Sequence, residues 1–301
     1  MVTNQISSQQ AETAFSGLGG MIKAELIKLR KRQMTQVLLG ILVAIIAIVN
    51  LLLLAISKVR TNAAGQAPIR ITNLLGLPVA IPFALSLLAS FGVLLAIILT
   101  ASSVGNEYNW KTIRTALISS QSRFKFLVAK LVSLGILILI GMVIGVATGF
   151  IMSLITTALG GYTFDFSFAT GSYLWAQFLQ FWRTFYIIMP FSLLGFAMAI
   201  LGRSAMPGIA TGIGVFFLED IVTALMRAAG GWIANVPDYL LNTNTSAITA
   251  LNDLPTRFAM GGGNSSATLP TLLHAFIILG LYSVVFLFIG LYLFRKRDVT
   301  V

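Results

Sequence analysis

The sequence lacks cysteine, has a single histidine and carries few charged residues. Without cysteine the chain has no disulfide framework and no thiolate metal site. No Ser/His/Asp set and no metal-ligand spacing converges on the lone His274, so we predict neither catalysis nor a bound metal. Only 10% of the residues are charged, whereas an average soluble domain is about a quarter charged. This scarcity excludes an ordinary water-exposed globular enzyme.

Apolar residues dominate instead, at 57% of the chain and a mean hydropathy of +0.92. These values predict an integral membrane protein. The N-terminal residues are polar, and the first apolar run starts near Thr35. With a length of about 20 residues, this run suits a retained span better than a cleavable signal core. We therefore expect a polar tail at 1–18 and a single six-helix transmembrane domain at 19–301.

Six apolar runs are long enough to cross a bilayer, whose core of about 30 Å needs about 20 helical residues. They lie at about 35–57, 79–104, 125–158, 183–202, 205–227 and 271–294. The predicted fold class is all-α, an integral membrane protein with six transmembrane helices. Between the third and fourth runs, residues 159–182 combine Tyr and Trp with helical apolar spacing, which predicts a separate interfacial helix.

The distribution of Lys and Arg predicts the orientation of the spans. With both termini cytoplasmic, fourteen basic residues fall inside and five outside, while Arg183 lies near the outer interface. The fourteen are Lys23, Lys28, Arg30, Lys31, Arg32, Lys111, Arg114, Arg123, Lys125, Lys130, Arg203, Arg295, Lys296 and Arg297. We therefore expect a multi-pass protein of the plasma (inner) membrane. Because topology explains the net charge of +11, no nucleic-acid partner is expected.

Two amphipathic segments interrupt this apolar background. The first is basic, covers residues 23–32 and precedes the first span. The second covers residues 106–123 and joins the second and third spans. As a helix, the second segment places Trp110, Ile113 and Leu117 on one face. Such a surface helix either anchors its loop or transmits the motion of a docked partner to the two spans.

The second segment resembles the hallmark of type-2 ATP-binding-cassette (ABC) permeases, roughly Glu-x₃-Gly-Thr-x-Arg-x-Leu-Leu-x-x-Pro-x-Ser-Arg followed by Ala-Lys. The matching positions here are Thr112, Arg114, Ser122, Arg123, Ala129 and Lys130. The chain departs from the pattern at Lys111, where Gly is usual, and lacks the family's Pro near Ser120. Residues 25–30 resemble the family's amphipathic elbow helix, and residues 294–298 resemble its cytoplasmic tail. The segment 236–251 is similar to its outer segment after span 5, so the resemblance runs along essentially the whole chain.

The resemblance implies the membrane-spanning subunit of an ABC transporter that exports an amphipathic or hydrophobic substrate. It implies an N-terminal elbow helix with Glu25, Lys28 and Arg30. It also implies a cytoplasmic coupling helix between spans 2 and 3 that docks a separate ABC ATPase subunit. The residues expected to dock are Glu107, Trp110, Lys111, Ile113, Arg114, Leu117 and Arg123.

The same resemblance implies a second permease copy, as a homodimer or heterodimer. This chain has no Gly-x₄-Gly-Lys-Ser/Thr phosphate loop, so we expect it not to be an enzyme itself. It is expected to bind no cofactor, and ATP-Mg would belong to the partner subunit.

Glu219 and Asp220 lie inside the fifth apolar run, where each charge costs about 2.5–3.5 kcal/mol on insertion scales. They could face a polar cavity, pair with Arg183 or Arg227, or mark a break in the helix. The resemblance favours a position near an outer gate. The alternative function is a self-contained cation- or proton-coupled secondary transporter that uses these two carboxylates.

Small residues at Gly141, Gly145 and Gly149 share one face of the third span. Such a face lets two helix backbones approach closely, either within one chain or between subunits. His274 stands near the start of the last span, where a lone histidine is typically a hydrogen-bonding residue. Asp165 and Asp253 fall in predicted outer loops, where we expect solvated side chains.

Overall fold

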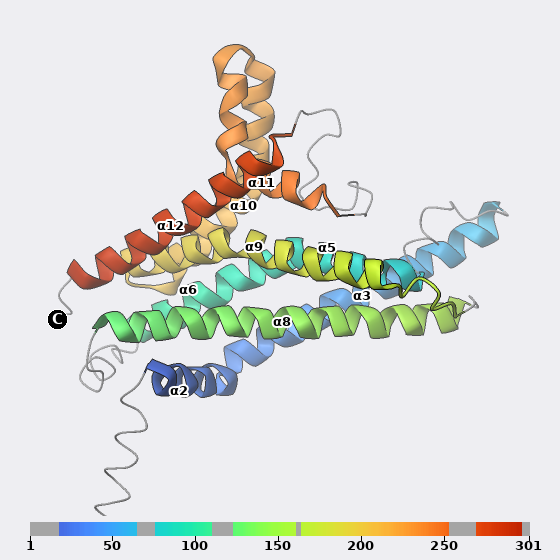
Figure 1. The fold of residues 1–301 in the computed structure, drawn as a ribbon, viewed down its shortest axis with the longest axis horizontal. Coiled ribbons are helices and arrows are strands. Elements are labelled where there is room, and N and C mark those ends of the chain that lie inside the picture. Colours follow the sequence, from blue (N-terminus) through green and yellow to red (C-terminus); the bar gives the residue numbers. More distant parts are fainter. Residues whose placement is uncertain (1–17, 65–75, 110–122, 161–163, 253–268, 297–301) are drawn as a thin grey trace, which may run out of the picture.

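A computed structural model describes residues 18–64, 76–109, 123–160, 164–252 and 269–296. Every regular element within these residues is a helix (Figure 1). Six helical stretches in them are long and apolar enough to cross a membrane: Gln33–Ser57, Leu77–Tyr108, Phe124–Gly160, Gly171–Gly202, Ala205–Ala229 and Leu272–Phe294. For the described residues, the prediction of an all-α fold with six helices long and apolar enough to span a membrane is therefore confirmed.

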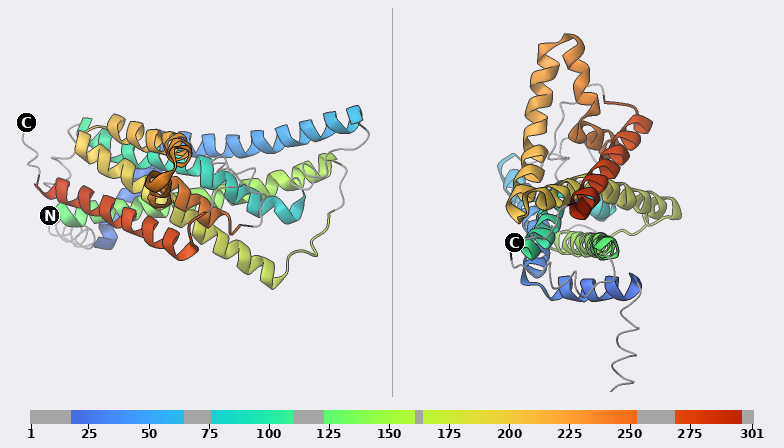
Figure 2. Two further views of the ribbon diagram at one scale, coloured as in Figure 1. Left: turned by 90° about the horizontal axis from the view of Figure 1, so that it is seen from above. Right: turned by 90° about the vertical axis from the view of Figure 1, so that its left-hand side faces the viewer.

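The described chain begins with two helices that meet at a corner. α2 (Leu18–Lys31) and α3 (Gln33–Ala64) are separated by Arg32 alone. Figure 2 (right) shows the long helix α8 (Arg123–Gly160) end-on, with α2 running across it. α2 buries Glu25 and Leu29 and exposes Lys28 and Arg30. The predicted amphipathic helix before the first span is present.

The second apolar stretch changes helix type along its length. A 3-10 turn η1 (Leu77–Val79), α5 (Ala80–Leu87), a π-helical turn η2 (Leu88–Gly92) and α6 (Val93–Asn109) follow one another directly. Leu88, in the π-helical turn, lies against Gly145 of α8. Single π turns of this kind occur mostly inside α-helices and frequently at functional sites.

The fourth span is longer at its start than the sequence predicted. α9 runs from Gly171 to Gly202 as one helix, and Thr170 caps it by accepting a hydrogen bond from the Tyr173 N–H (3.3 Å). The prediction of a separate interfacial helix over 159–182 was therefore wrong. The apolar spacing of 171–182 continues into the span without a breaking residue, and Trp182 with Arg183 does not end the helix.

The C-terminal third of the chain departs most from a simple bundle. It contains α10 (Ala205–Ala229), the 3-10 helix η3 (Gly231–Tyr239), α11 (Leu241–Thr249) and α12 (Leu272–Lys296). The end of α10 and η3 form a helical hairpin that stands away from the other helices (orange, top of Figure 1). Gly230 and Gly231, both with positive φ, make the turn between them.

Glycines allow the central helices to approach closely. A Cβ at Gly105 of α6 would collide with the backbone of Ala205 at the start of α10. A Cβ at Gly149 would lie 2.4 Å from the Cβ of Ala84 in α5. Two of the three glycines predicted to form a small-residue face, Gly145 and Gly149, thus serve packing within the chain, whereas a Cβ at Gly141 would meet open space.

The ends of six helices meet at one end of the molecule. There α2, α6, α8, α9, α10 and α12 come together over an apolar cluster that includes Leu29, Val104, Leu127, Ile200 and Phe294. The start of α9 lies at the other end, where Tyr173 Oη donates to the carbonyl of Pro78 (2.8 Å). The described helix ends next to the basic residues predicted to be cytoplasmic therefore lie at a common end.

Candidate functional site: a buried charge cluster where three helices meet

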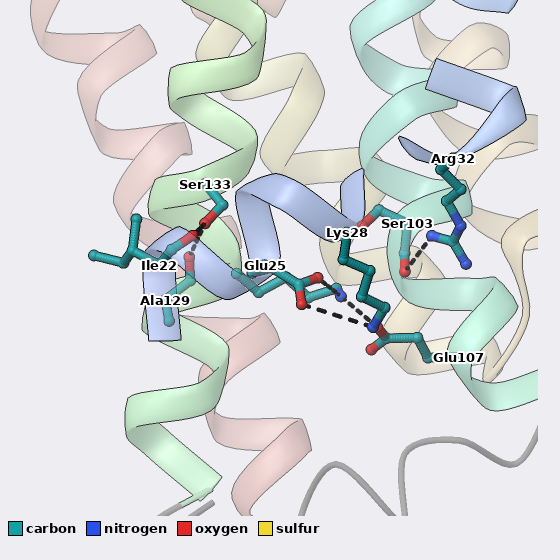
Figure 3. A network of polar contacts seen from close by, with 9 residues as sticks. Ile22, Glu25, Lys28, Arg32, Ser103, Glu107, Ala129 and Ser133 are labelled. Atoms are coloured by element: carbon teal, nitrogen blue, oxygen red, sulfur yellow. Dashed lines mark hydrogen bonds and ion pairs between the residues drawn. The ribbon is translucent and has the colours of Figure 1, made fainter. Parts of the chain in front are cut away.

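Four charged side chains from three helices form a compact cluster at this common end (Figure 3). The charge cluster consists of Glu25 and Lys28 from α2, Glu107 from α6 and Lys130 from α8. Lys130 Nζ donates to Glu25 Oε1 (2.6 Å) and to Glu107 Oε1 (2.7 Å). Lys28 Nζ donates to the same Glu107 oxygen (2.5 Å) and lies 3.6 Å from Glu25 Oε2. The four groups close a ring of alternating charge.

Burial makes this arrangement energetically demanding. Lys130 is 1% exposed, Glu107 2% and Glu25 8%, whereas the side chain of Lys28 is 47% exposed. A buried charge is tolerated only when it is paired and hydrogen-bonded. Two carboxylates and two ammonium groups balance to zero, and the Lys130 ammonium also lies 5.6 Å from the ring centroid of Phe126. The cluster is thus internally compensated.

Backbone contacts surround the cluster and join the same three helices. Ser133 Oγ of α8 donates to the carbonyl of Ile22 in α2 (3.1 Å) and to its own helix at Ala129 (2.8 Å). Arg32 Nη1 donates to the carbonyl of Ser103 in α6 (3.4 Å). These bonds fix α2 across the end of α6 and the start of α8.

The charge cluster lies beside the two helix ends that flank the predicted coupling helix. α6 ends at Asn109 and α8 begins at Arg123. The predicted docking residues Trp110, Lys111, Ile113, Arg114 and Leu117 lie outside the described residues, so the coupling helix stays a prediction. Arg123 begins α8, but the structure does not describe its side chain.

Three predicted site residues, Glu25, Lys28 and Glu107, are therefore brought together. Arg30 of the same predicted elbow set points elsewhere and lines a cavity beside α2. Lys130 matches the family pattern but was not among the predicted site residues. A lysine within a long apolar run is the signal that could have found it, because such a charge requires a buried partner.

The two carboxylates of the fifth run serve a different purpose. Glu219 is 7% exposed and its carboxylate accepts a hydrogen bond from the backbone N–H of Asn242, in the first turn of α11. The Asn242 side chain donates to the carbonyl of Phe216 (2.7 Å) and to Asp220 Oδ1 (3.3 Å). A carboxylate at a helix N-terminus satisfies N–H groups that the helix itself leaves free. Glu219 and Asp220 thus tie α11 to α10.

Arg227, considered as a partner for these carboxylates, instead contacts Asp238 across the hairpin (3.6 Å). His274 Nε2 lies 3.0 Å from the carbonyl oxygen of Asp238, which confirms its prediction as a hydrogen-bonding residue. Asp165 is exposed, and hydrogen bonds from the backbone N–H and hydroxyl of Ser167 lower the pKa of its carboxyl group. Asp253 lies outside the described residues.

Among the residues described, no three His, Asp or Glu side chains are grouped so that they could hold a metal ion. The charge cluster joins three helices through charge-assisted hydrogen bonds.

Comparison with known proteins places the chain in a family. Residues 73–300 match the family described as "Protein of unknown function (DUF2705)". The chain is also 26% identical over 217 residues to the Bacillus subtilis (strain 168) protein described as "Uncharacterized protein YhcI". That match covers 68% of this chain but 64% of the relative, which is less than two thirds of its length. Because the family match covers most of the chain, including α6, α8 and the C-terminal helices, this protein belongs to the DUF2705 family.

Proposed function

We propose that this chain is the membrane-spanning permease subunit of an ABC transporter of the cell membrane. A separate ATPase subunit with ATP-Mg would dock on residues 110–122, and a second permease copy would complete the transport path. Both termini and the docking segment would face the cytoplasm, in line with the excess of basic residues on that side. The cargo would be an amphipathic or hydrophobic molecule that is exported, and the chain itself would hydrolyse nothing.

The observation that supports this proposal best is the charge cluster. Glu107 lies at the end of α6, Lys130 lies near the start of α8, and both bind α2 through Glu25 and Lys28. The segment expected to contact the ATPase therefore connects α6 to α8, and the charge cluster bonds these two helices to each other and to α2. A force on the segment would reach all three helices together.

The free-energy cost of opening the charge cluster favours a movement of α2, α6 and α8 as one rigid body. Removing one partner from a buried ion pair typically costs about 3–5 kcal/mol, because the remaining charge stays buried without compensation. Opening the cluster during a transport cycle would carry a comparable cost. A rigid-body tilt of α2, α6 and α8 avoids that cost, since every bond in the cluster is kept.

The carrier alternative gains less support from the geometry. A proton- or cation-coupled carrier needs carboxylates that are free to exchange their ligand. Glu219 and Asp220 are instead both hydrogen-bonded to Asn242, where they hold the start of α11. This use explains two charges in an apolar helix without an ion pathway.

Trp110 provides the test of the docking proposal. The chain is purified from native membranes in mild detergent, and an accompanying protein is accepted as the motor only if it hydrolyses ATP. Burying a large aromatic side chain is worth about 2–3 kcal/mol, so Trp110→Ala should weaken motor binding roughly thirtyfold or more. The measurement is the binding constant of the purified motor for the permease in nanodiscs.

The matched control is Trp232→Ala, the same change at the exposed hairpin position (78% exposed). It should leave motor binding as in the unmodified protein. An unchanged binding constant for Trp110→Ala, or a purified chain that never brings an ATPase with it, would count against the proposal.

A further inference from the structure

A cavity of about 540 Å³ opens in the corner between α2 and α3. Its walls include Leu26 of α2, Leu39 of α3, Leu95 of α6, and Ile138 and Met142 of α8. This volume lies within the range of about 300–1,000 Å³ that is typical of small-molecule sites. Apart from a few residues on α2 and α3, every lining side chain is apolar or glycine.

The polar lining residues are Arg30, Thr35 and Gln36. They belong to the end of α2 and the first turns of α3, so they lie together at the corner. Gln36 Nε2 donates to the carbonyl of Arg30 (3.5 Å), which joins the two sides of that corner. Arg30 is exposed, and none of the described residues that line the cavity is acidic. The cavity therefore combines a long apolar interior with one cationic group at its edge.

We propose that this cavity binds one acyl chain of an anionic membrane phospholipid, with the lipid phosphate held by the Arg30 guanidinium. The apolar walls fit a hydrocarbon chain, which needs no hydrogen-bonding partners. Guanidinium binds phosphate through paired, charge-assisted hydrogen bonds, and Thr35 and Gln36 supply further donors at the same edge. Anionic lipids are attracted by basic segments beside membrane spans, and α2 is such a segment.

This lipid site is independent of the proposed transport function and of any partner ATPase. A bound lipid would affect the position of α2. The cavity lies between α2 and the helices α6 and α8, to which the charge cluster binds α2. A lipid chain at this place would fill the space beneath the corner of α2 and α3. The site thus makes the position of α2 depend on the lipid composition of the membrane.

Arg30 tests the recognition of the headgroup. The delipidated protein is titrated with phosphatidylglycerol or with phosphatidylcholine of identical acyl chains, and bound lipid is counted by native mass spectrometry. We expect one tightly held phosphatidylglycerol per chain, preferred about tenfold over phosphatidylcholine. Arg30→Gln should abolish the preference, whereas Lys31→Gln should keep it, because it removes the same charge from the same helix outside the cavity.

Gly141 tests the acyl-chain site. A Cβ at Gly141 meets open space, and Gly141 lines the cavity, so the side chain of Gly141→Leu would enter it. This variant should lose tight binding of both lipids by at least tenfold. Gly135→Leu is the control, since Gly135 lies on the same helix, also faces open space, and is not among the lining residues.

A third measurement locates the bound chain. Phosphatidylglycerol with a photoreactive group at the end of one acyl chain should label peptides from the cavity walls in α3 and α8. Labelling confined to other parts of the protein, equal retention by Gly141→Leu and Gly135→Leu, or equal affinity for the two headgroups in the unmodified protein would each overturn the proposal.

Discussion

At the scale of single residues, Lys130 is the side chain that the fold constrains most. It is almost completely buried in a long apolar helix, yet its ammonium group contacts two carboxylates and the ring of Phe126. A lysine costs much free energy in such surroundings unless its charge is compensated. Its presence is explained because Glu25 and Glu107 approach it from two other helices.

Replacing Lys130 should therefore destabilise the protein more than replacing an exposed lysine outside the charge cluster. In Lys130→Met, Glu25 and Glu107 remain close together and buried, so we expect a loss of about 3–5 kcal/mol of unfolding free energy. The measurement is thermal unfolding in detergent micelles. Lys23→Met, at an exposed position of α2, should change stability by less than about 1 kcal/mol. Equal stability of the two variants would show that the cluster contributes little.

Glu219 allows a second prediction at the same scale. In Glu219→Leu the Asn242 N–H loses its acceptor, a change worth about 1 kcal/mol, so amide exchange at the start of α11 should quicken roughly fivefold. Glu219→Gln keeps an acceptor oxygen and should leave exchange almost unchanged. If both variants abolish transport while exchange stays normal, the carboxylate has a functional role that α11 does not explain.

At the scale of helices, the apolar runs predicted the spans because length and composition determine them. The errors arose where a boundary depends on tertiary contacts. Trp182 and Arg183 suggested an interface, but α9 begins at Gly171 because Thr170 caps it and Tyr173 bonds to Pro78. The change of helix type at Leu88–Gly92 was not predicted from the sequence.

The close contact between α6 and α10 supplies a prediction for this scale. A side chain at Gly105 would meet the backbone of Ala205, which cannot move aside without displacing α10. Gly105→Leu should therefore lower stability by about 1–3 kcal/mol or more. Gly135→Leu, a substitution into open space, serves as the control in the same thermal unfolding assay. Matching melting temperatures would mean that α6 and α10 do not touch in the membrane.

At the scale of the whole molecule, one end of the helix assembly carries the features that a partner could use. Six helices converge there, the charge cluster fastens three of them, and the segment 110–122 joins α6 to α8 at the same place. The positions of Lys and Arg predicted only which span ends share one side of the membrane. The sequence could not predict the ring of charges, because Glu25, Glu107 and Lys130 are far apart in the chain and meet only after folding.

The most direct test of the proposed function is whether residues 110–122 touch an ATPase inside the cell. Because the chain has no cysteine, Leu117→Cys creates a single reactive site for crosslinking in native membranes, and Phe166→Cys, in an exposed loop, is the matched control. We predict that Leu117→Cys crosslinks to an ATP-hydrolysing protein and is shielded from an impermeant thiol reagent added outside intact cells, whereas Phe166→Cys does not crosslink. Labelling of Leu117→Cys from outside, or the absence of any ATPase crosslink at this position, would contradict the account.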